Sequence, residues 1–548
     1  MVNGMRIDDV LSYIMSDEFY RKLERIYGDN ATSQRERYRK VVTLAKRYLG
    51  SDADVVVSRA PGRVNLMGRH IDYMGGYVNP IATSDDIISV LEKRKNDTVV
   101  LYNTDPNYKS GSFRISEELP KEKIESLADW DKWTVKMAAE RSKEGKEFTW
   151  IDYVKGLFIY LQVKFKDEIK LDGFNIVVDG TIPSKRGMSS SSALVVSVAM
   201  ALRSIYNFKV SLGEFIDIVG YSEWYRLTRG GTADHAAIIL SKKNYVSHIK
   251  CLPTVAEEVT YAPLPKGYSI YLIDSGVERP HTEEAFNYLR VTAASYRIGV
   301  LLLKSLFPEY ADKIVLLRDF NTRNLGINLV DLYGMLKKIP EKATRRELWK
   351  MVNEKYHDEL NTIFTNHNEP QGGYRLRENI LYGIAETERA RIFPYFLKMG
   401  DISKILRLIE VSHDGDRVSI FDKELRKKKW DSSIFSSNEK LDEYIRILTN
   451  SDDSVKKERV QLHWIPGGYG RSIEEIDFIC DYIRNNYASY AAAQIMGAGL
   501  GGNVLVLVKR EKASQMLNSL KDVYKEYYGI DLQYMEVKSG EGACVLLS

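Results

Sequence analysis

The sequence predicts a mixed α/β protein of two domains, and three observations indicate this. A chain of 548 residues is too long for one compact core. Residues 174–178 have the pattern of a strand, which ends near a glycine and leads into a serine-opened helical segment. The pattern resets at LPKG, residues 264–267, just before a strong strand at 268–277. We therefore expect one domain at residues 1–265 and a second at 266–548.

The first domain is expected to be β-rich and backed by helices. Apolar residues at helical spacing predict helices within residues 5–50, and APGR at 60–63 is expected to be a turn between two strands. The expected strands are residues 54–59, 64–67, 87–93, 98–103 and 174–178, and the expected later helices are 150–160, the serine-led segment and 211–227.

Long helices dominate the second domain. They are expected at residues 283–307, 380–399, 402–413, 473–486 and 514–527, with strands at 492–496, 503–509 and 533–537. The charged stretches near 305–372 and 414–466 are interpreted as helical insertions or lids.

Composition excludes several classes of protein. A net charge of +4, from 79 cations and 75 anions, gives no indication of a nucleic-acid partner. Three cysteines without CxxC spacing indicate neither a disulfide framework nor a zinc site, and they fit a reducing cytoplasm. The first 30 residues do not resemble a signal peptide, and the longest apolar run is about half a membrane span, so no membrane partner is expected.

The stretch at residues 180–202, GTIPSKRGMSSSSALVVSVAMAL, predicts an anion-binding helix start. The first N–H groups of a helix are unpaired and carry partial positive charge. Gly187 allows a phosphate to approach the backbone, and the serines from Ser189 to Ser192 add donors or a metal ligand. An ordinary serine N-cap is the alternative, and the spacing of a Walker A loop is missing.

Two further stretches extend this observation to a family. APGRVNLMGRHIDYMGG at residues 60–76 and MGAGLGG at 496–502 flank PSKRGMSSSSA in sequence order. Together the three segments resemble those of the GHMP small-molecule kinases, and the first resembles the galactokinase signature RVNLxGxHxDYxGG. The resemblance implies a two-domain fold with a β-rich N-terminal domain, a ferredoxin-like α+β C-terminal domain carrying helical insertions, and an active site between them.

The same resemblance implies an ATP-dependent kinase that converts the anomeric hydroxyl of a galactose-like monosaccharide to a sugar 1-phosphate. Asp234 matches the catalytic aspartate, which takes the hydroxyl proton, and Arg63 matches the arginine that keeps this carboxylate ionised. A turn residue after two glycines is the alternative role for Asp234.

Phosphate and metal contacts follow from the resemblance as well. Ser191 and Glu223 match the magnesium positions, although Glu223 lies one residue closer to Asp234 than the family spacing, and a surface helix position is its alternative. Lys185 and Arg186 replace small residues of the loop and either bind nucleotide phosphate or are solvated. The expected nucleotide-binding residues are Lys185, Gly187, Met188, Ser189, Ser190, Ser191 and Ser192.

The resemblance assigns sugar contacts to His70, Asp72 and Gly231. Here the sequence departs from the pattern. Arg69 stands where galactokinases carry a glutamate, and Phe286 stands where they carry a tyrosine. Arg69 could pair with a carboxylate, which would favour a uronic acid, or it could form an ion pair within the protein.

Two other functions stay open at this stage. One is a non-catalytic sensor that binds ATP and a sugar on the same scaffold, and the other is a kinase for a non-sugar alcohol. The retained serine loop and Asp234 favour catalysis over the sensor. The oligomeric state is not readable from the sequence.

Overall fold

The computed structural model describes residues 4–183, 186–227, 230–280 and 282–548. It divides the chain into two compact units. Unit 1 is formed by Met1–Val64, Pro80–Tyr261 and Lys538–Ser548, and unit 2 by Asn65–Asn79 and Ala262–Val537. The division after Tyr261 lies close to the expected boundary at residue 265. However, residues 65–79, which precede that boundary, belong to unit 2, and residues 538–548, which follow it, belong to unit 1. Within the described residues, no helix has the length and apolar character needed to cross a membrane.

Unit 1 is built on a seven-stranded sheet with the order β1-β2-β4-β7-β5-β6, and β18 pairs with β2. Strand β5 runs parallel to β7, and β4 runs antiparallel to β7. The strands are β1 (Met5–Arg6), β2 (Asp54–Asn65), β4 (Pro80–Lys93), β5 (Thr98–Asn103), β6 (Gly111–Arg114), β7 (Phe174–Gly180) and β18 (Cys544–Leu547). The helices are α1 (Ile7–Ile14), α2 (Asp17–Tyr27), α3 (Ala31–Leu49), α4 (Ile115–Glu118), α5 (Leu127–Lys143), α6 (Ile151–Lys164), α7 (Ser190–Tyr206), α8 (Leu212–Ser222) and α9 (Ala233–Leu240).

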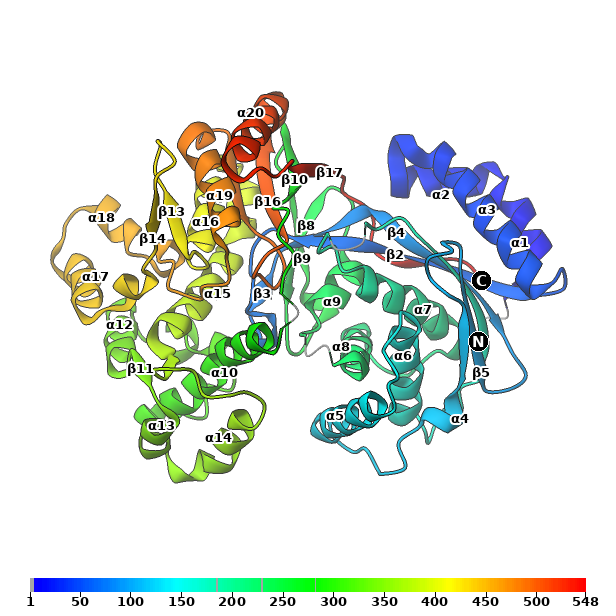
Figure 1. The fold of residues 1–548 in the computed structure, drawn as a ribbon, viewed down its shortest axis with the longest axis horizontal. Helices are drawn as coiled ribbons and strands as arrows, with labels where there is room; N and C mark the ends of the chain where they lie inside the picture. The colour runs from blue at the N-terminus through cyan, green and yellow to red at the C-terminus, as the bar shows by residue number, and fades with distance from the viewer. Residues whose placement is uncertain (1–3, 184–185, 228–229, 281) are drawn as a thin grey trace. The chain divides into compact units, whose positions relative to one another are not determined.

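Alternation along the strands decides which helices cover which face of this sheet. Val57 of β2 and Val90 of β4 pack into the apolar cluster of α1–α3. Ser58 and Ser89, one residue along each strand, point the other way and both hydrogen-bond to Ser197 of α7. The N-terminal helices therefore lie on one face, and the serine-led helix lies on the other (Figure 1).

The expected turn at APGR is wrong. Strand β2 continues through residues 60–63 as far as Asn65. A proline lacks the N–H that a ladder needs, which makes a break the natural expectation. The strand persists because it is held beyond the proline, where the Arg63 N–H donates to the carbonyl of Met188 at 3.1 Å.

Unit 2 contains a four-stranded antiparallel sheet with the order β15-β16-β10-β17. Its strands are β10 (Tyr268–Asp274), β15 (Ala491–Ile495), β16 (Asn503–Lys509) and β17 (Gln533–Val537), so the strands expected at 503–509 and 533–537 are confirmed. The long helices are α10 (Glu283–Leu306), α15 (Leu376–Met399), α16 (Ile402–Asp414), α19 (Glu474–Tyr487) and α20 (Arg510–Tyr528). The mixed α/β class expected from the sequence is confirmed.

The two stretches interpreted as insertions are folded parts of unit 2. The first contains α11 (Thr322–Leu325), α12 (Leu329–Lys338), α13 (Arg345–Met351) and α14 (His357–Phe364). Strand β11 (Lys342–Ala343), between α12 and α13, pairs with β12 (Tyr374–Arg375), which follows directly after the stretch. The second contains the ribbon of β13 (Ser419–Phe421) and β14 (Lys427–Lys429), then α17 (Asn438–Asn450) and α18 (Ser454–Arg459). Residues of both stretches share one apolar cluster with α10 and α15.

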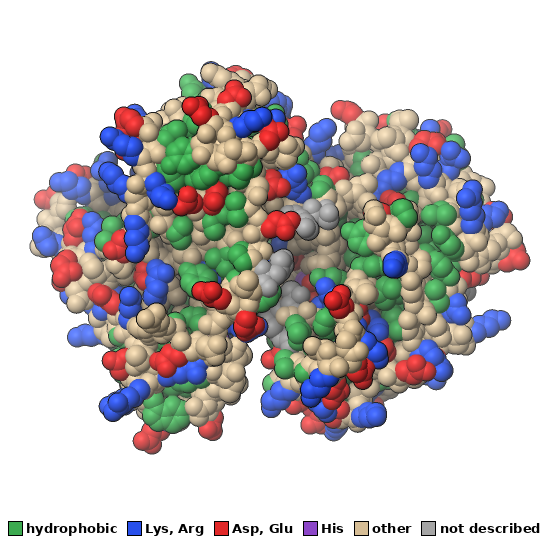
Figure 2. Space-filling view, in the orientation of Figure 1, with side chains coloured by type: hydrophobic (Ala, Val, Ile, Leu, Met, Phe, Trp, Pro, Cys, Tyr) green, Lys and Arg blue, Asp and Glu red, His purple; other side chains and the backbone are tan. Residues whose placement is uncertain are grey.

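Charges on the surface are mixed. Lys, Arg, Asp and Glu side chains are interspersed over the visible face of each unit, without an extended field of one sign (Figure 2). This agrees with the nearly balanced count of 79 cations and 75 anions.

Candidate active site

Arg63 and Asp234 form the most tightly defined charged pair of the candidate site in unit 1. Arg63 lies near the end of β2, and Asp234 lies in the first turn of α9. Nε of Arg63 donates to Oδ1 of Asp234 at 2.7 Å, and Nη2 donates to Oδ2 at 2.6 Å. The carboxylate side chain is 35% exposed and its partner 14%. The geometry is the two-pronged arrangement in which a guanidinium fixes a carboxylate most rigidly.

The serine loop meets this pair. Helix α7 begins at Ser190, as expected, and Ser189 before it has a positive φ of 54°. The hydroxyl of Ser189 donates to Oδ2 of Asp234 in a short hydrogen bond. Gly187, with φ +69°, presents its carbonyl to Nη1 of Arg63 at 2.6 Å. The structure thus brings the predicted base, its arginine and the serine loop together within unit 1.

Electrostatics keep Asp234 ionised. Burial opposes the charged form, but the guanidinium charge of Arg63 and hydrogen bonds from Arg63 and Ser189 hold the pKa of Asp234 below its ordinary value. A carboxylate in this state can accept a hydrogen bond from a substrate hydroxyl at neutral pH.

The other loop residues differ in exposure. Ser190 and Ser191 are partly exposed in the first turn of α7, whereas Met188 and Ser192 are buried. Gly231 lies just before Thr232 and α9. Lys185 is outside the described residues.

Glu223 begins a short 3-10 helix, Glu223–Arg226, directly after α8. Its side chain is almost fully buried, and Oε1 lies 2.9 Å from Nε2 of His235. The surface-helix alternative for Glu223 is therefore wrong, because this carboxylate faces the interior beside α9.

Arg69 is committed to partners inside unit 2. Its side chain is 4% exposed, and Nη2 lies 3.0 Å from Oδ2 of Asp416, a carboxylate that is fully buried. Nη1 donates to the carbonyl of Ile495 at 2.5 Å, and Nη2 donates to the hydroxyl of Ser412 at 3.0 Å. Of the two readings of Arg69, the structure supports the ion pair within the protein.

His70 shares the same carboxylate. Its Nε2 lies 3.6 Å from Oδ1 of Asp416, and its ring stacks on Tyr469 with centroids 4.9 Å apart. Burial lowers the pKa of His70, with Asp416 opposing that shift. Burial likewise opposes ionisation of Asp416, but His70 and Arg69 hold its pKa well below the ordinary value. The ring of His70 is thus fixed between an anion and an aromatic face.

Two other predicted sugar contacts lie in the same unit. Asp72 is half-buried at the start of a 3-10 helix, Asp72–Met74, and Phe286 is half-buried near the start of α10. The glycine segment at 496–502 lies between β15 and β16. Gly499 packs so closely on Arg471 that a Cβ there would lie 2.4 Å from its carbonyl oxygen.

Sequence reasoning missed Asp416 and Tyr469. Asp416 belongs to the stretch near 414–466, where the sequence indicated only a helical insertion or lid, and Tyr469 lies three residues beyond that stretch. A buried arginine requires a buried anion, so Arg69 signals that a partner exists. Nothing in local pattern says which carboxylate it is.

Comparisons with known proteins show what the chain resembles. Residues 44–93 match the galactokinase galactose-binding signature, and residues 152–242 match the N-terminal domain of GHMP kinases. A galactokinase of Thermotoga petrophila is 24% identical over 88% of this chain and 98% of its own length. One from Pyrococcus furiosus is 25% identical over 89% and 99%. The structure of Lactococcus lactis galactokinase complexed with galactose has a TM-score of 0.60 at 19% identity, covering 92% of this chain and 98% of that one, which supports the fold.

Residues 152–242 thus resemble the N-terminal domain of GHMP kinases. The signature match at residues 44–93 and the relatives over most of the chain support the galactokinase-like branch of those kinases.

The Arg69–Asp416 pair makes a stability prediction. Arg69→Met and Asp416→Asn should each lower the free energy of unfolding by about 3–5 kcal/mol, because each leaves an uncompensated buried charge. The double variant should lose less than the sum of the two, with a coupling of roughly 0.5–3 kcal/mol. Urea unfolding of all three variants measures this. Arg290→Gln, which breaks the exposed pair with Glu283, is the control and should cost at most about 1 kcal/mol. Strictly additive single effects would contradict the pairing.

Proposed function

We propose that this protein is an ATP-dependent sugar kinase that phosphorylates the anomeric hydroxyl of a galactose-like neutral monosaccharide. The single observation that carries the proposal is the contact of Asp234 with both Arg63 and Ser189. A base, its counter-charge and the start of the phosphate loop are thereby placed at one point, which is what phosphoryl transfer asks of a protein. The galactokinase relatives support the same activity.

In the proposed mechanism the Asp234 carboxylate accepts the proton of the C1 hydroxyl as that oxygen attacks the terminal phosphorus of ATP. The bond from this phosphorus to the bridging oxygen breaks, and ADP leaves. Arg63 keeps the carboxylate ionised before the step and offsets negative charge as it develops. Backbone N–H groups and hydroxyls from Gly187 to Ser192 bind the nucleotide phosphates at the start of α7. The residues of this loop orient the phosphate chain, and Asp234 moves the proton.

Magnesium is part of the proposal. The described residues contain no group of three or more His, Cys, Asp or Glu side chains that could hold a metal ion. The hydroxyl of Ser191 and the carboxylate of Glu223 are hard oxygen donors that fit Mg²⁺, which is usually held by few protein ligands and by the nucleotide itself. When bound, the ion would neutralise phosphate charge. His235 would keep Oε1 of Glu223 in place.

A neutral sugar is proposed because Arg69 is occupied. Its guanidinium bonds Asp416, Ser412 and Ile495, so no paired set of N–H groups remains for a substrate carboxylate. His70 and Asp72 are the residues that we propose to contact sugar hydroxyls. A uronic acid is not favoured, and neither is the non-catalytic sensor, because the Asp234 cluster is complete.

The choice of sugar is tested by measuring ADP release with a panel of neutral sugars and uronic acids. Galactose should be turned over, with galacturonate and glucuronate slower by a factor of about 10² or more, because their carboxylate finds no free counter-charge. Turnover of a uronate equal to that of galactose would refute the neutral-sugar proposal. Absence of turnover with every sugar would count against the kinase itself.

Replacement of the base separates catalysis from binding. Asp234→Asn should lower kcat by a factor of about 10²–10⁴, because an amide cannot take the proton. Stabilisation of the variant by ATP and galactose in thermal unfolding should remain, since the phosphate loop and the sugar contacts are intact. Asp52→Asn, which removes an exposed carboxylate of the same unit, is the matched control and should keep wild-type activity. A non-catalytic sensor would instead show no turnover in either the wild type or the variant.

The pH profile reports the role of Arg63. Asp234 must be ionised to act, so activity falls as pH drops through its pKa, which Arg63 holds below the ordinary value. In Arg63→Met that pKa should rise above about 3.9, because burial then acts without the counter-charge. The acid limb of kcat/KM should therefore move to higher pH. Arg39→Met, which changes an exposed arginine of α3, should leave the limb where it is. An unmoved limb in Arg63→Met would rule out its effect on the base.

A further inference from the structure

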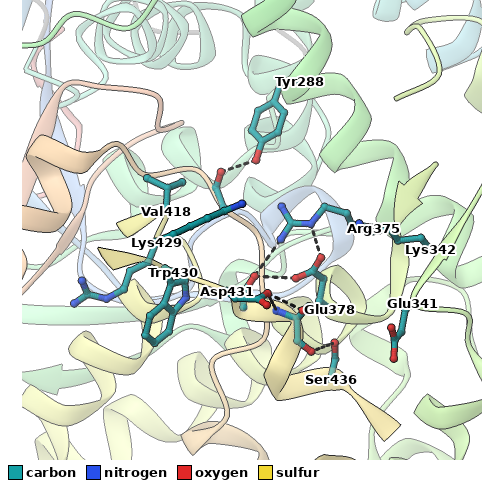
Figure 3. Close-up of a pocket in the computed structure, with 14 residues that line it drawn as sticks. Tyr288, Glu341, Lys342, Arg375, Glu378, Val418, Lys429, Trp430, Asp431 and Ser436 are labelled. Carbon is teal, nitrogen blue, oxygen red and sulfur yellow. Dashed lines mark hydrogen bonds and ion pairs between the residues drawn. The ribbon is translucent and has the colours of Figure 1, made fainter. Parts of the chain in front are cut away.

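A cavity in unit 2 is not used by the proposed mechanism. It has a volume of about 590 Å³ and lies between the β11–β12 pair, the β13–β14 ribbon and α10 (Figure 3). Its walls come largely from the two stretches that the sequence marks as insertions. Trp430 and Val418 supply apolar surface, and the hydroxyls of Tyr288, Ser432, Ser433 and Ser436 supply polar groups.

The acids of the cavity mostly have partners. Glu378 accepts from Nε of Arg375 in a short hydrogen bond and from the hydroxyl of Ser432 at 2.8 Å. Glu341 pairs with Arg377 at 3.1 Å. Asp431 accepts from the backbone and the hydroxyl of Ser433.

The cationic side chains that line the cavity have fewer partners than the acidic ones. Lys342 and Lys429 make no ion pair within 4.0 Å among the described residues. Lys342 stands directly opposite Arg375 in the β11–β12 register, and like charges in that position repel. Arg375 uses Nε and Nη2 for Glu378 and Ser432, which leaves Nη1 without an acceptor in the described part of the chain. Lys429 extends across the cavity toward Arg375 (Figure 3). An anion placed among these three groups would relieve the repulsion.

We propose that this cavity binds a phosphorylated sugar. The phosphate oxygens would accept hydrogen bonds from the N–H groups of Arg375, Lys342 and Lys429. The serine and tyrosine hydroxyls would meet sugar hydroxyls, and the indole of Trp430 would cover the apolar side of the ring. The sugar phosphate is either the sugar 1-phosphate that the proposed function produces or one phosphorylated elsewhere, and only the first source rests on that function.

The walls of the cavity connect it with the predicted sugar contacts. Gly470 lines it and accepts a hydrogen bond from Tyr288 at 2.6 Å, while the adjacent Tyr469 stacks on His70. Val418 lines it two residues after Asp416, which pairs with Arg69 and His70. A ligand that shifts either segment moves a partner of His70, so occupancy should change KM for the sugar more than kcat.

Calorimetry without ATP tests the site independently of turnover. The probes are galactose 1-phosphate, glucose 6-phosphate, inorganic phosphate and galactose, with wild type, Lys429→Gln, Lys342→Gln and Lys428→Gln. Lys428 is the matched control, because it carries the same charge on β14 but alternates to the opposite face. Lys429→Gln and Lys342→Gln should each raise the Kd for a sugar phosphate by about tenfold or more, and Lys428→Gln should leave it unchanged. Asp431→Asn should tighten binding of the sugar phosphate, since it removes a negative charge while the amide oxygen can still accept hydrogen bonds from Ser433.

The outcomes distinguish the two sources of sugar phosphate, and they test the cavity proposal separately from the kinase proposal. A preference for galactose 1-phosphate identifies the product as the ligand, whereas a preference for glucose 6-phosphate identifies an outside metabolite class. Equal affinity of wild type, Lys429→Gln and Lys342→Gln, or equal weakening by Lys428→Gln, overturns the cavity site. Because no turnover is needed, loss of this site would leave the kinase proposal untouched, and failure of the sugar screen would leave this binding intact.

Discussion

The pairing of Arg63 with Asp234 is the constraint on which the candidate site of unit 1 depends. It ties together the end of β2, the loop before α7 and the first turn of α9, because Arg63 also holds the carbonyls of Gly187 and Met188. A shift of any one of these segments would break a charged hydrogen bond in a partly buried setting. Positioning of the serine loop and ionisation of the proposed base, Asp234, are therefore parts of one interaction.

The corresponding constraint in unit 2 is the buried anion Asp416. The resemblance to galactokinases implies a glutamate at the position of Arg69, and placing a cation in a buried position is costly unless an anion lies beside it. Asp416 is that anion, and it also faces His70. The local charge is thus restored by a side chain from a remote segment. The proposal of a neutral sugar rests on the partners that occupy the Arg69 guanidinium, rather than on its charge alone.

Local patterns predicted much of the fold and little of this compensation. Strands such as Asn503–Lys509 and Gln533–Val537 were predictable because their apolar runs are bounded by turn residues. APGR was misread as a turn because the proline signal is local, while the bond from Arg63 to Met188 that sustains β2 is not. The roles of Arg63 and Asp234 came from resemblance. Asp416 could not be found by resemblance or by periodicity, since it lies in a stretch without a family counterpart.

Both of these points hold a residue with an unusual backbone conformation. Ser189 and His70 are non-glycine residues with φ of 54° and 59°. Such conformations cost of order 1–3 kcal/mol where the surroundings do not compensate, and they persist only when neighbouring contacts hold them. Ser189 is held by Asp234, and His70 by Tyr469 and Asp416. Other non-glycine residues, such as Leu227 and Leu425, also have positive φ, so this conformation alone does not mark a functional position. What sets Ser189 and His70 apart is that the side chains holding them are those of the proposed base and of the buried anion beside the proposed sugar contact. Function is therefore inferred from these contacts, and the backbone conformation follows from them.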